Sequence, residues 1–122
     1  MTQKYSSTIK QHYHYPRHAG KIIHPTYTFE QINSLCGDET KVYLKIHDGT
    51  IADISHETRG CMIAVAAASV LSVYIQGKKM ELIQNVNLEN ISKLLDTQIS
   101  KTRESCATLL LQAFKKINLS EE

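Results

Sequence analysis

Residues 41–56 read KVYLKIHDGTIADISH. The apolar side chains of the first half occur at every second position: Val42, Leu44 and Ile46. This alternation is the period of a β-strand with one buried face. Asp48-Gly49 follows, a dipeptide typical of the tight turn of a β-hairpin. The chain from Thr50 to His56 is therefore expected to return as the antiparallel partner strand.

Segments on both sides of the hairpin extend the predicted fold. Tyr27 to Ile32 is expected to form a third strand. Residues 3–14 are expected to form a helix that ends before Pro16, because the residue that precedes a proline is pushed out of the helical region. After Gly60 the apolar period becomes helical, and it continues until Gly77 stops the helix.

Two further helices are expected in the last third of the chain. Asn87 is suited to cap a short helix that runs to about Leu95. A final helix is predicted by one apolar stripe: Cys106, Leu109, Leu110, Ala113, Phe114 and Ile117. The order of these elements predicts an α+β fold, a small antiparallel three-stranded sheet with helices packed on one face. Residues 1–122 are expected to form a single domain.

Charge and cysteine content exclude several classes of protein. The 14 basic and 12 acidic residues give a net charge of +2, too small for strong field-driven binding to nucleic acid or to a membrane surface. No apolar run approaches the roughly 20 residues of a membrane-spanning helix. The 3 cysteines are an odd number and the first residues are polar, which argues against a secreted disulfide framework. We expect a soluble, cytoplasmic protein.

Three cysteines and one carboxylate are the candidate metal ligands. Cys36 and Asp38 fall in a predicted turn. Cys61 is expected at the junction between a strand and a helix, and Cys106 in the first turns of the last helix. Together they offer four anionic ligands, the number that a tetrahedral thiophilic metal site or a small iron–sulfur cluster takes from its surroundings. None of the cysteine pairs has the Cys-x-x-Cys spacing of a zinc finger.

The predicted positions of two thiols favour the reactive form. Cys61 and Cys106 are expected near helix amino termini, where unpaired N–H groups and the helix dipole stabilise a thiolate and lower its pKa. Arg103 precedes Cys106 and would add a positive charge. The alternative for Cys106 is a buried and inert thiol, because it shares the apolar stripe of its helix.

Short motifs follow one another along the chain: residues 12–20 (HYHYPRHAG), 33–38 (NSLCGD), 48–54 (DGTIADI), 60–63 (GCMI), 67–69 (AAS) and 103–109 (RESCATL). In this order they resemble the motifs of the U-type iron–sulfur cluster assembly scaffolds, the family of the IscU, SufU and amino-terminal NifU proteins. The resemblance extends over nearly the whole chain.

The resemblance implies a SufE/IscU-like fold and a function. Members of the family accept sulfur from a cysteine desulfurase and transiently bind a [2Fe–2S] cluster, which apo-acceptor iron–sulfur proteins receive. The family ligands fall on Cys36, Asp38, Cys61 and Cys106. Of these, Cys106 falls on the position that receives persulfide sulfur, and Asp38 is a labile ligand that would let the cluster leave. Such a scaffold is not expected to be an enzyme with its own turnover.

Departures from the family leave two alternatives open. Ser105 occupies the position where IscU proteins carry a histidine. Residues 96–101 (DTQISK) lack the prolines that a dedicated chaperone recognises in IscU proteins. The last motif is similar to that of SufU proteins, which bind Zn2+, although the interval from Cys61 to Cys106 leaves no room for the SufU insertion. One alternative is a zinc-bound sulfurtransferase that activates a cysteine desulfurase and relays persulfide sulfur. The other is a structural zinc-binding module that mediates protein contacts.

Overall fold

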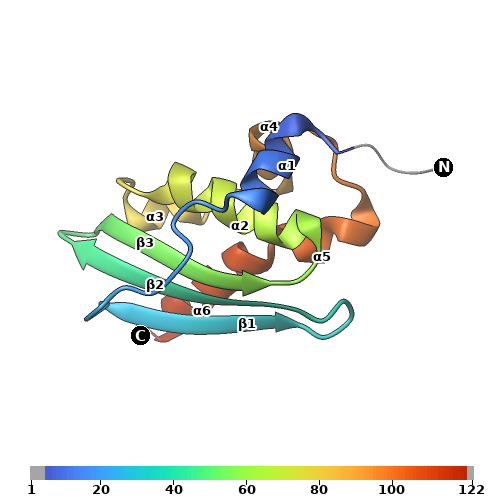
Figure 1. Cartoon of the computed structure of the whole chain (residues 1–122). Helices are drawn as coiled ribbons and strands as arrows, with labels where there is room; N and C mark the ends of the chain where they lie inside the picture. The colour runs from blue at the N-terminus through green and yellow to red at the C-terminus, as the bar shows by residue number, and fades with distance from the viewer. Residues whose placement is uncertain (1–4, 121–122) are drawn as a thin grey trace.

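The computed structural model describes residues 5–120, with side chains described for residues 5–116. Three antiparallel strands form one sheet in the order β1 (Tyr27–Asn33), β2 (Asp38–His47) and β3 (Thr50–Arg59). The helices are α1 (Ser7–His14), α2 (Met62–Ile75), α3 (Met80–Ile83), α4 (Leu88–Leu94), the 3-10 turn η1 (Lys101–Arg103), α5 (Glu104–Ala107) and α6 (Leu109–Ser120). They pack on one face of the sheet (Figure 1), so the predicted α+β fold is confirmed.

The hairpin of β2 and β3 forms as predicted. Its turn residues, Asp48 and Gly49, both have positive φ, +52° and +75°, as the favoured two-residue hairpin turn requires. Leu44 lies opposite Ile54, and both are fully buried under the helices. β3 extends beyond the predicted end at His56, to Arg59, and this longer strand carries the chain to the start of α2.

The helix α2 is the centre of the core. It is apolar around most of its circumference, which is typical of a helix buried on all sides. As predicted, it starts directly after Cys61 and ends before Gly77. On its flank, α6 covers β1, where the rings of Phe29 and Phe114 meet edge to face at 5.4 Å. Among the helices of residues 5–120, none combines the length and the apolar composition that crossing a membrane requires.

Two further details differ from the sequence prediction. Asp38 is the first residue of β2 rather than part of the preceding turn. The last helix is interrupted at Thr108, whose hydroxyl donates to the carbonyl oxygen of Glu104 at 2.8 Å and whose backbone leaves the helical region. Residues 3 and 4 of the first predicted helix, and the side chain of Ile117, lie outside the described part of the chain.

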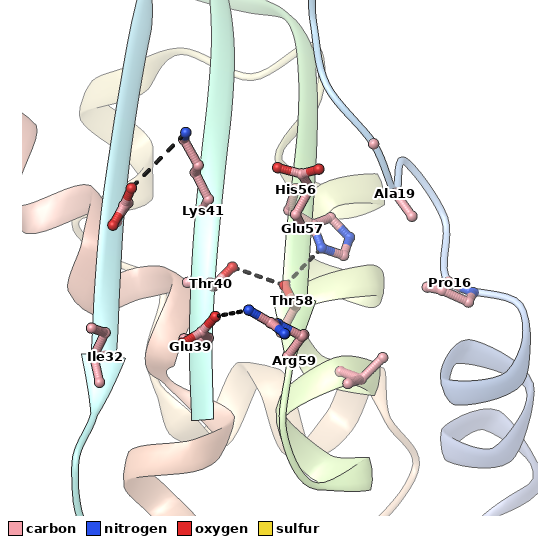
Figure 2. Close-up of a pocket in the computed structure, with 13 residues that line it drawn as sticks. Pro16, Ala19, Ile32, Glu39, Thr40, Lys41, His56, Glu57, Thr58 and Arg59 are labelled. Atoms are coloured by element: carbon pink, nitrogen blue, oxygen red, sulfur yellow. Dashed lines mark hydrogen bonds and ion pairs between the residues drawn. The ribbon is translucent and has the colours of Figure 1, made fainter. Parts of the chain in front are cut away.

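The segment that follows α1 is held against α2 and β3 by polar contacts. Ser69 Oγ accepts the backbone N–H of Arg17 at 2.8 Å and lies 2.7 Å from His12 Nδ1. His56 Nε2 donates to the carbonyl oxygen of Arg17 at 2.9 Å, so its Nδ1 accepts the Thr58 hydroxyl at 2.8 Å (Figure 2). Burial lowers the pKa of His56 and so favours the neutral form of the ring.

The opposite face of the sheet carries paired charges. Arg59 donates to Glu39 at 2.8 Å across β2 and β3 (Figure 2), and Lys41 lies 4.0 Å from Glu30 across β1 and β2. Exposed ion pairs of this kind contribute only about 0–1 kcal/mol each. The buried apolar cluster, which joins the sheet to the helices, lies on the other face of the sheet.

Candidate metal centre

The carboxylate of Asp38 is buried, and only one of its two oxygens accepts a hydrogen bond. Its Oδ1 accepts a hydrogen bond from the backbone N–H of Cys61 at 2.9 Å. Its Oδ2 has no hydrogen-bond partner among the residues whose side chains are described, although Asp38 is fully buried. Leaving a buried polar group unsatisfied costs about 1–3 kcal/mol, and more for a charged group. This oxygen is therefore available to bind a cation.

Gly60 makes room for this carboxylate. A Cβ atom at Gly60 would lie 2.2 Å from Asp38 Oδ1, closer than non-bonded atoms approach. Its φ of +151° is also a conformation that other residues rarely adopt. The junction between β3 and α2 is therefore shaped around Asp38.

The thiols of Cys36 and Cys106 meet beside Asp38. Cys36 is exposed on the turn between β1 and β2, whereas Cys106, in α5, is fully buried. Their Sγ atoms are 3.5 Å apart. One ligand atom from each of Cys36, Asp38 and Cys106 lies within 4.8 Å of the other two. Thiolates that bind one zinc ion tetrahedrally at about 2.3 Å are about 3.8 Å apart, so the two sulfurs are spaced about as a shared metal requires.

Cys61 lies next to this group as the N-cap of α2, the position that the sequence predicts. Its Sγ accepts the backbone N–H of Ala64 at 3.5 Å. Its sulfur is not among the ligand atoms gathered within 4.8 Å. It nevertheless lies close enough to Cys106 to raise the pKa of that thiol. The structure thus brings three of the predicted ligands together and places the fourth beside them.

The predicted activation of Cys106 by its helix is wrong. Burial is the largest cause of a raised pKa at this thiol, followed by its contacts with Asp38 and with the other two cysteines. A negative charge on Cys106 would be poorly solvated and would stand beside other acidic groups. A four-residue helix does not offset that cost. A bound cation would do so, because a thiol that coordinates a metal ion is deprotonated.

Arg103 supplies a positive charge near these thiols. It ends η1, and the neighbouring Cys61 is the largest cause of the raised pKa of its guanidinium. Tyr5 and Cys106 act in the same direction. The residue therefore lies where the sequence analysis expects a supporting cation.

Sequence reasoning missed Asn33, the last residue of β1. Its side-chain amide donates to Ser105 Oγ at 3.1 Å and lies 3.8 Å from Cys106 Sγ. The signal was present, because asparagine before a turn commonly bonds the backbone two residues on. That bond is formed here by the N–H of Leu35 and Asn33 Oδ1 at 3.3 Å.

The fold and the gathered donors define a small protein with a candidate site for a thiophilic metal. Residues 4–118 match the family model described as the NifU-like N terminal domain, and the chain belongs to this family of U-type scaffolds.

Curated relatives agree with this assignment, and a solved structure shares the fold. The chain is 30% identical to the iron–sulfur cluster assembly scaffold protein IscU of Thermotoga maritima, over 93% of this chain and 94% of the relative. It is 27% identical to the zinc-dependent sulfurtransferase SufU of Bacillus subtilis, over 97% of this chain and 91% of the relative. The crystal structure of the SUF-system protein FiSufU of Fervidobacterium islandicum shares the fold, with a TM-score of 0.78 at 23% identity, over 92% of this chain and 94% of that one.

Proposed function

We propose that this chain is an iron–sulfur cluster assembly scaffold. It accepts sulfur from a cysteine desulfurase and holds a [2Fe–2S] cluster as cargo for apo-acceptor proteins. The observation that carries the proposal is the group of ligand atoms from Cys36, Asp38 and Cys106 within 4.8 Å, with one buried Asp38 oxygen left unpaired. The scaffold function named for the relatives in Archaeoglobus fulgidus and Thermotoga maritima supports it. The reducing cytoplasm is the proposed location, because it keeps such thiols unoxidised.

Cys36, Asp38, Cys61 and Cys106 are the proposed ligands of the cargo. Thiolates are the usual ligands of iron–sulfur clusters. A carboxylate oxygen is a harder ligand than sulfur and binds a thiophilic centre less firmly. Asp38 is therefore the ligand expected to be released first, and a labile ligand suits a protein that gives up its cargo.

Cys106 is the proposed acceptor of sulfur. Burial raises the pKa of the Cys106 thiol, so this thiol loses its proton as its sulfur attacks the outer sulfur of the desulfurase persulfide. The S–S bond of that persulfide breaks, and the desulfurase cysteine leaves and takes up a proton. The sulfur changes carrier without net oxidation. Because Cys106 is fully buried and Cys36 is exposed 3.5 Å away, the turn that carries Cys36 is expected to move aside during transfer.

A zinc-bound sulfurtransferase that activates a desulfurase is the second candidate. Ser105 offers no imidazole ligand, and its hydroxyl already accepts a hydrogen bond from Asn33. A zinc ion would then be bound by thiolates and Asp38, and the 3.5 Å between the sulfurs of Cys36 and Cys106 fits one tetrahedral ion. In this function Cys106 would be released from the ion to take sulfur.

Anaerobic reconstitution distinguishes the two functions. The protein is incubated with ferrous iron, cysteine, a cysteine desulfurase and a dithiol reductant that converts persulfide sulfur to sulfide, and the sulfur-to-iron absorption of a cluster is followed. We expect the absorption to develop in the parent and to be lost in Cys36→Ser and Cys106→Ser. Tight zinc with persulfide formation but no cluster would favour the sulfurtransferase. Zinc binding by thiols that accept no persulfide would instead favour the structural zinc module.

A further inference from the structure

Asn33 contacts three of the candidate ligand segments at once. Its backbone pairs with Asp38 across β1 and β2. Its carbonyl oxygen accepts the N–H of Cys36 at 3.3 Å and that of Gly37 at 2.8 Å. Its side-chain nitrogen lies 3.8 Å from Cys106 Sγ. Asn33 is only 8% exposed, so water competes little for these contacts.

The orientation of the Asn33 amide follows from its neighbours. The backbone N–H of Leu35 donates to Asn33 Oδ1, and a backbone N–H cannot accept. The oxygen of the amide therefore faces Leu35, and the NH2 group faces Ser105 Oγ and Cys106 Sγ. Each of its two hydrogens has one acceptor, a hydroxyl oxygen and a sulfur.

A hydrogen-bond donor on a ligand sulfur changes how that sulfur binds a metal. The N–H stabilises the negative charge of the thiolate and orients its lone pairs, and hydrogen bonds to sulfur are among the factors that set the properties of thiolate metal centres. A second contact of β1, with α6, has no hydrogen-bond donor directed at a sulfur. Gln31 also faces the helices, but its amide donates to the oxygen of Gln112 at 3.3 Å rather than to a sulfur.

We infer that Asn33 is a positioning residue, which directs the sulfur of Cys106 toward a metal shared with Cys36 and Asp38 and tunes that sulfur through an N–H···S hydrogen bond. The inference rests on the proposed function in one respect, because it requires a thiophilic metal or cluster at this site. The inference adds to the proposed ligands a residue, Asn33, that would not itself bind the metal.

Cobalt(II) is the probe for this role, because the energy of its sulfur-to-metal absorption band reports on the thiolate. Asn33→Asp retains an oxygen for Leu35 and removes both N–H donors, and Asn33→Ala removes the donors without adding a charge. Both variants are expected to bind cobalt at least about tenfold more weakly, as is typical when a group that orients a metal ligand is lost. In both, the band is expected to move to lower energy.

Two variants serve as matched controls. Gln31→Glu makes the same amide-to-carboxylate change on the same strand, and Ser105→Ala removes the other acceptor of the Asn33 amide. Both are expected to keep the band and the cobalt affinity of the parent. An unchanged band and affinity in the two Asn33 variants would overturn the inference. Equal losses in the controls would also overturn it.

The same measurements separate this inference from the proposed function. A parent that binds cobalt but assembles no cluster would refute the scaffold function, and the band would still decide the role of Asn33. A parent that binds no cobalt would overturn both. Circular dichroism identifies a variant that does not fold. If one Asn33 variant does not fold, the cobalt band and affinity of the other variant test the inference. Loss of the fold in both would make Asn33 a structural residue and overturn the inference.

Discussion

Gly60→Ala is expected to disrupt the candidate site without altering any ligand. The added Cβ would lie 2.2 Å from Asp38 Oδ1 and 2.7 Å from Asp38 Cγ. Asp38 is fully buried, so its carboxylate has no solvent-filled space to enter. It is therefore expected to lose the 2.9 Å hydrogen bond that it accepts from the N–H of Cys61.

The destabilisation expected for Gly60→Ala has two parts. Alanine at a φ of +151° strains the backbone by about 1–3 kcal/mol. Loss of a hydrogen bond to a charged group adds about 1.5–3 kcal/mol. The free energy of unfolding should fall by about 2.5–6 kcal/mol, a large part of the roughly 5–15 kcal/mol that stabilises a typical domain.

Gly77→Ala is the matched control for the backbone strain. Gly77 has a φ of +89°, and within the described chain nothing lies within 4 Å of an added Cβ. Its unfolding free energy should therefore fall by only about 1–3 kcal/mol. Urea unfolding followed by circular dichroism gives both values, and zinc titration against a competing chelator reports on the site. Equal destabilisation of the two variants, or parental zinc affinity in Gly60→Ala, would refute the reasoning.

Three further predictions concern ligand release, sulfur acceptance and pH. Asp38→Ala should transfer its cluster to an apo-acceptor about tenfold more slowly, a change of about 1.4 kcal/mol in the barrier, because only thiolates would then hold the cargo. Cys106→Ser should lose the persulfide that a desulfurase and cysteine place on the parent, as detected by mass spectrometry after alkylation. Burial lowers the pKa of His56, so the stability that this residue contributes is complete above its usual pKa of about 6.5 and is lost as the pH falls through the lowered value. The unfolding free energy of His56→Gln should therefore depend less on pH than that of the parent below about pH 6.5.

Each of these predictions has an outcome that contradicts it. Equal or faster transfer from Asp38→Ala would exclude a labile role for the carboxylate. Persulfide that forms on Cys106→Ser as fast as on the parent would move the acceptor role to another thiol, and Cys36→Ser is the comparison that locates it. An identical pH dependence in His56→Gln and the parent would show that the His56 ring does not limit stability in acid. Loss of the fold in a variant is checked by circular dichroism in every case.

Local patterns in the sequence were sufficient for the elements that flank the site. The alternation before Asp48-Gly49 predicted the hairpin, and the helical period between Gly60 and Gly77 predicted α2. The same pattern placed Cys61 at a helix amino terminus. These features depend on residues that are near one another in the chain. The spacing of apolar residues, every second position in a strand and every three to four in a helix, therefore predicts them directly. The family motifs then identified the four candidate ligands.

Tertiary structure alone decided how those ligands meet and why the pKa of Cys106 is raised. Cys36 and Cys106 are 70 positions apart, and no local pattern predicts that their sulfurs lie 3.5 Å from each other. The contact between Asn33 and Ser105, across 72 positions, was equally invisible in the sequence. Position at a helix amino terminus predicted a lowered pKa for Cys106, whereas burial raises it. Desolvation depends on every atom packed around a group, from all the elements that enclose it, and therefore only the folded structure determines it.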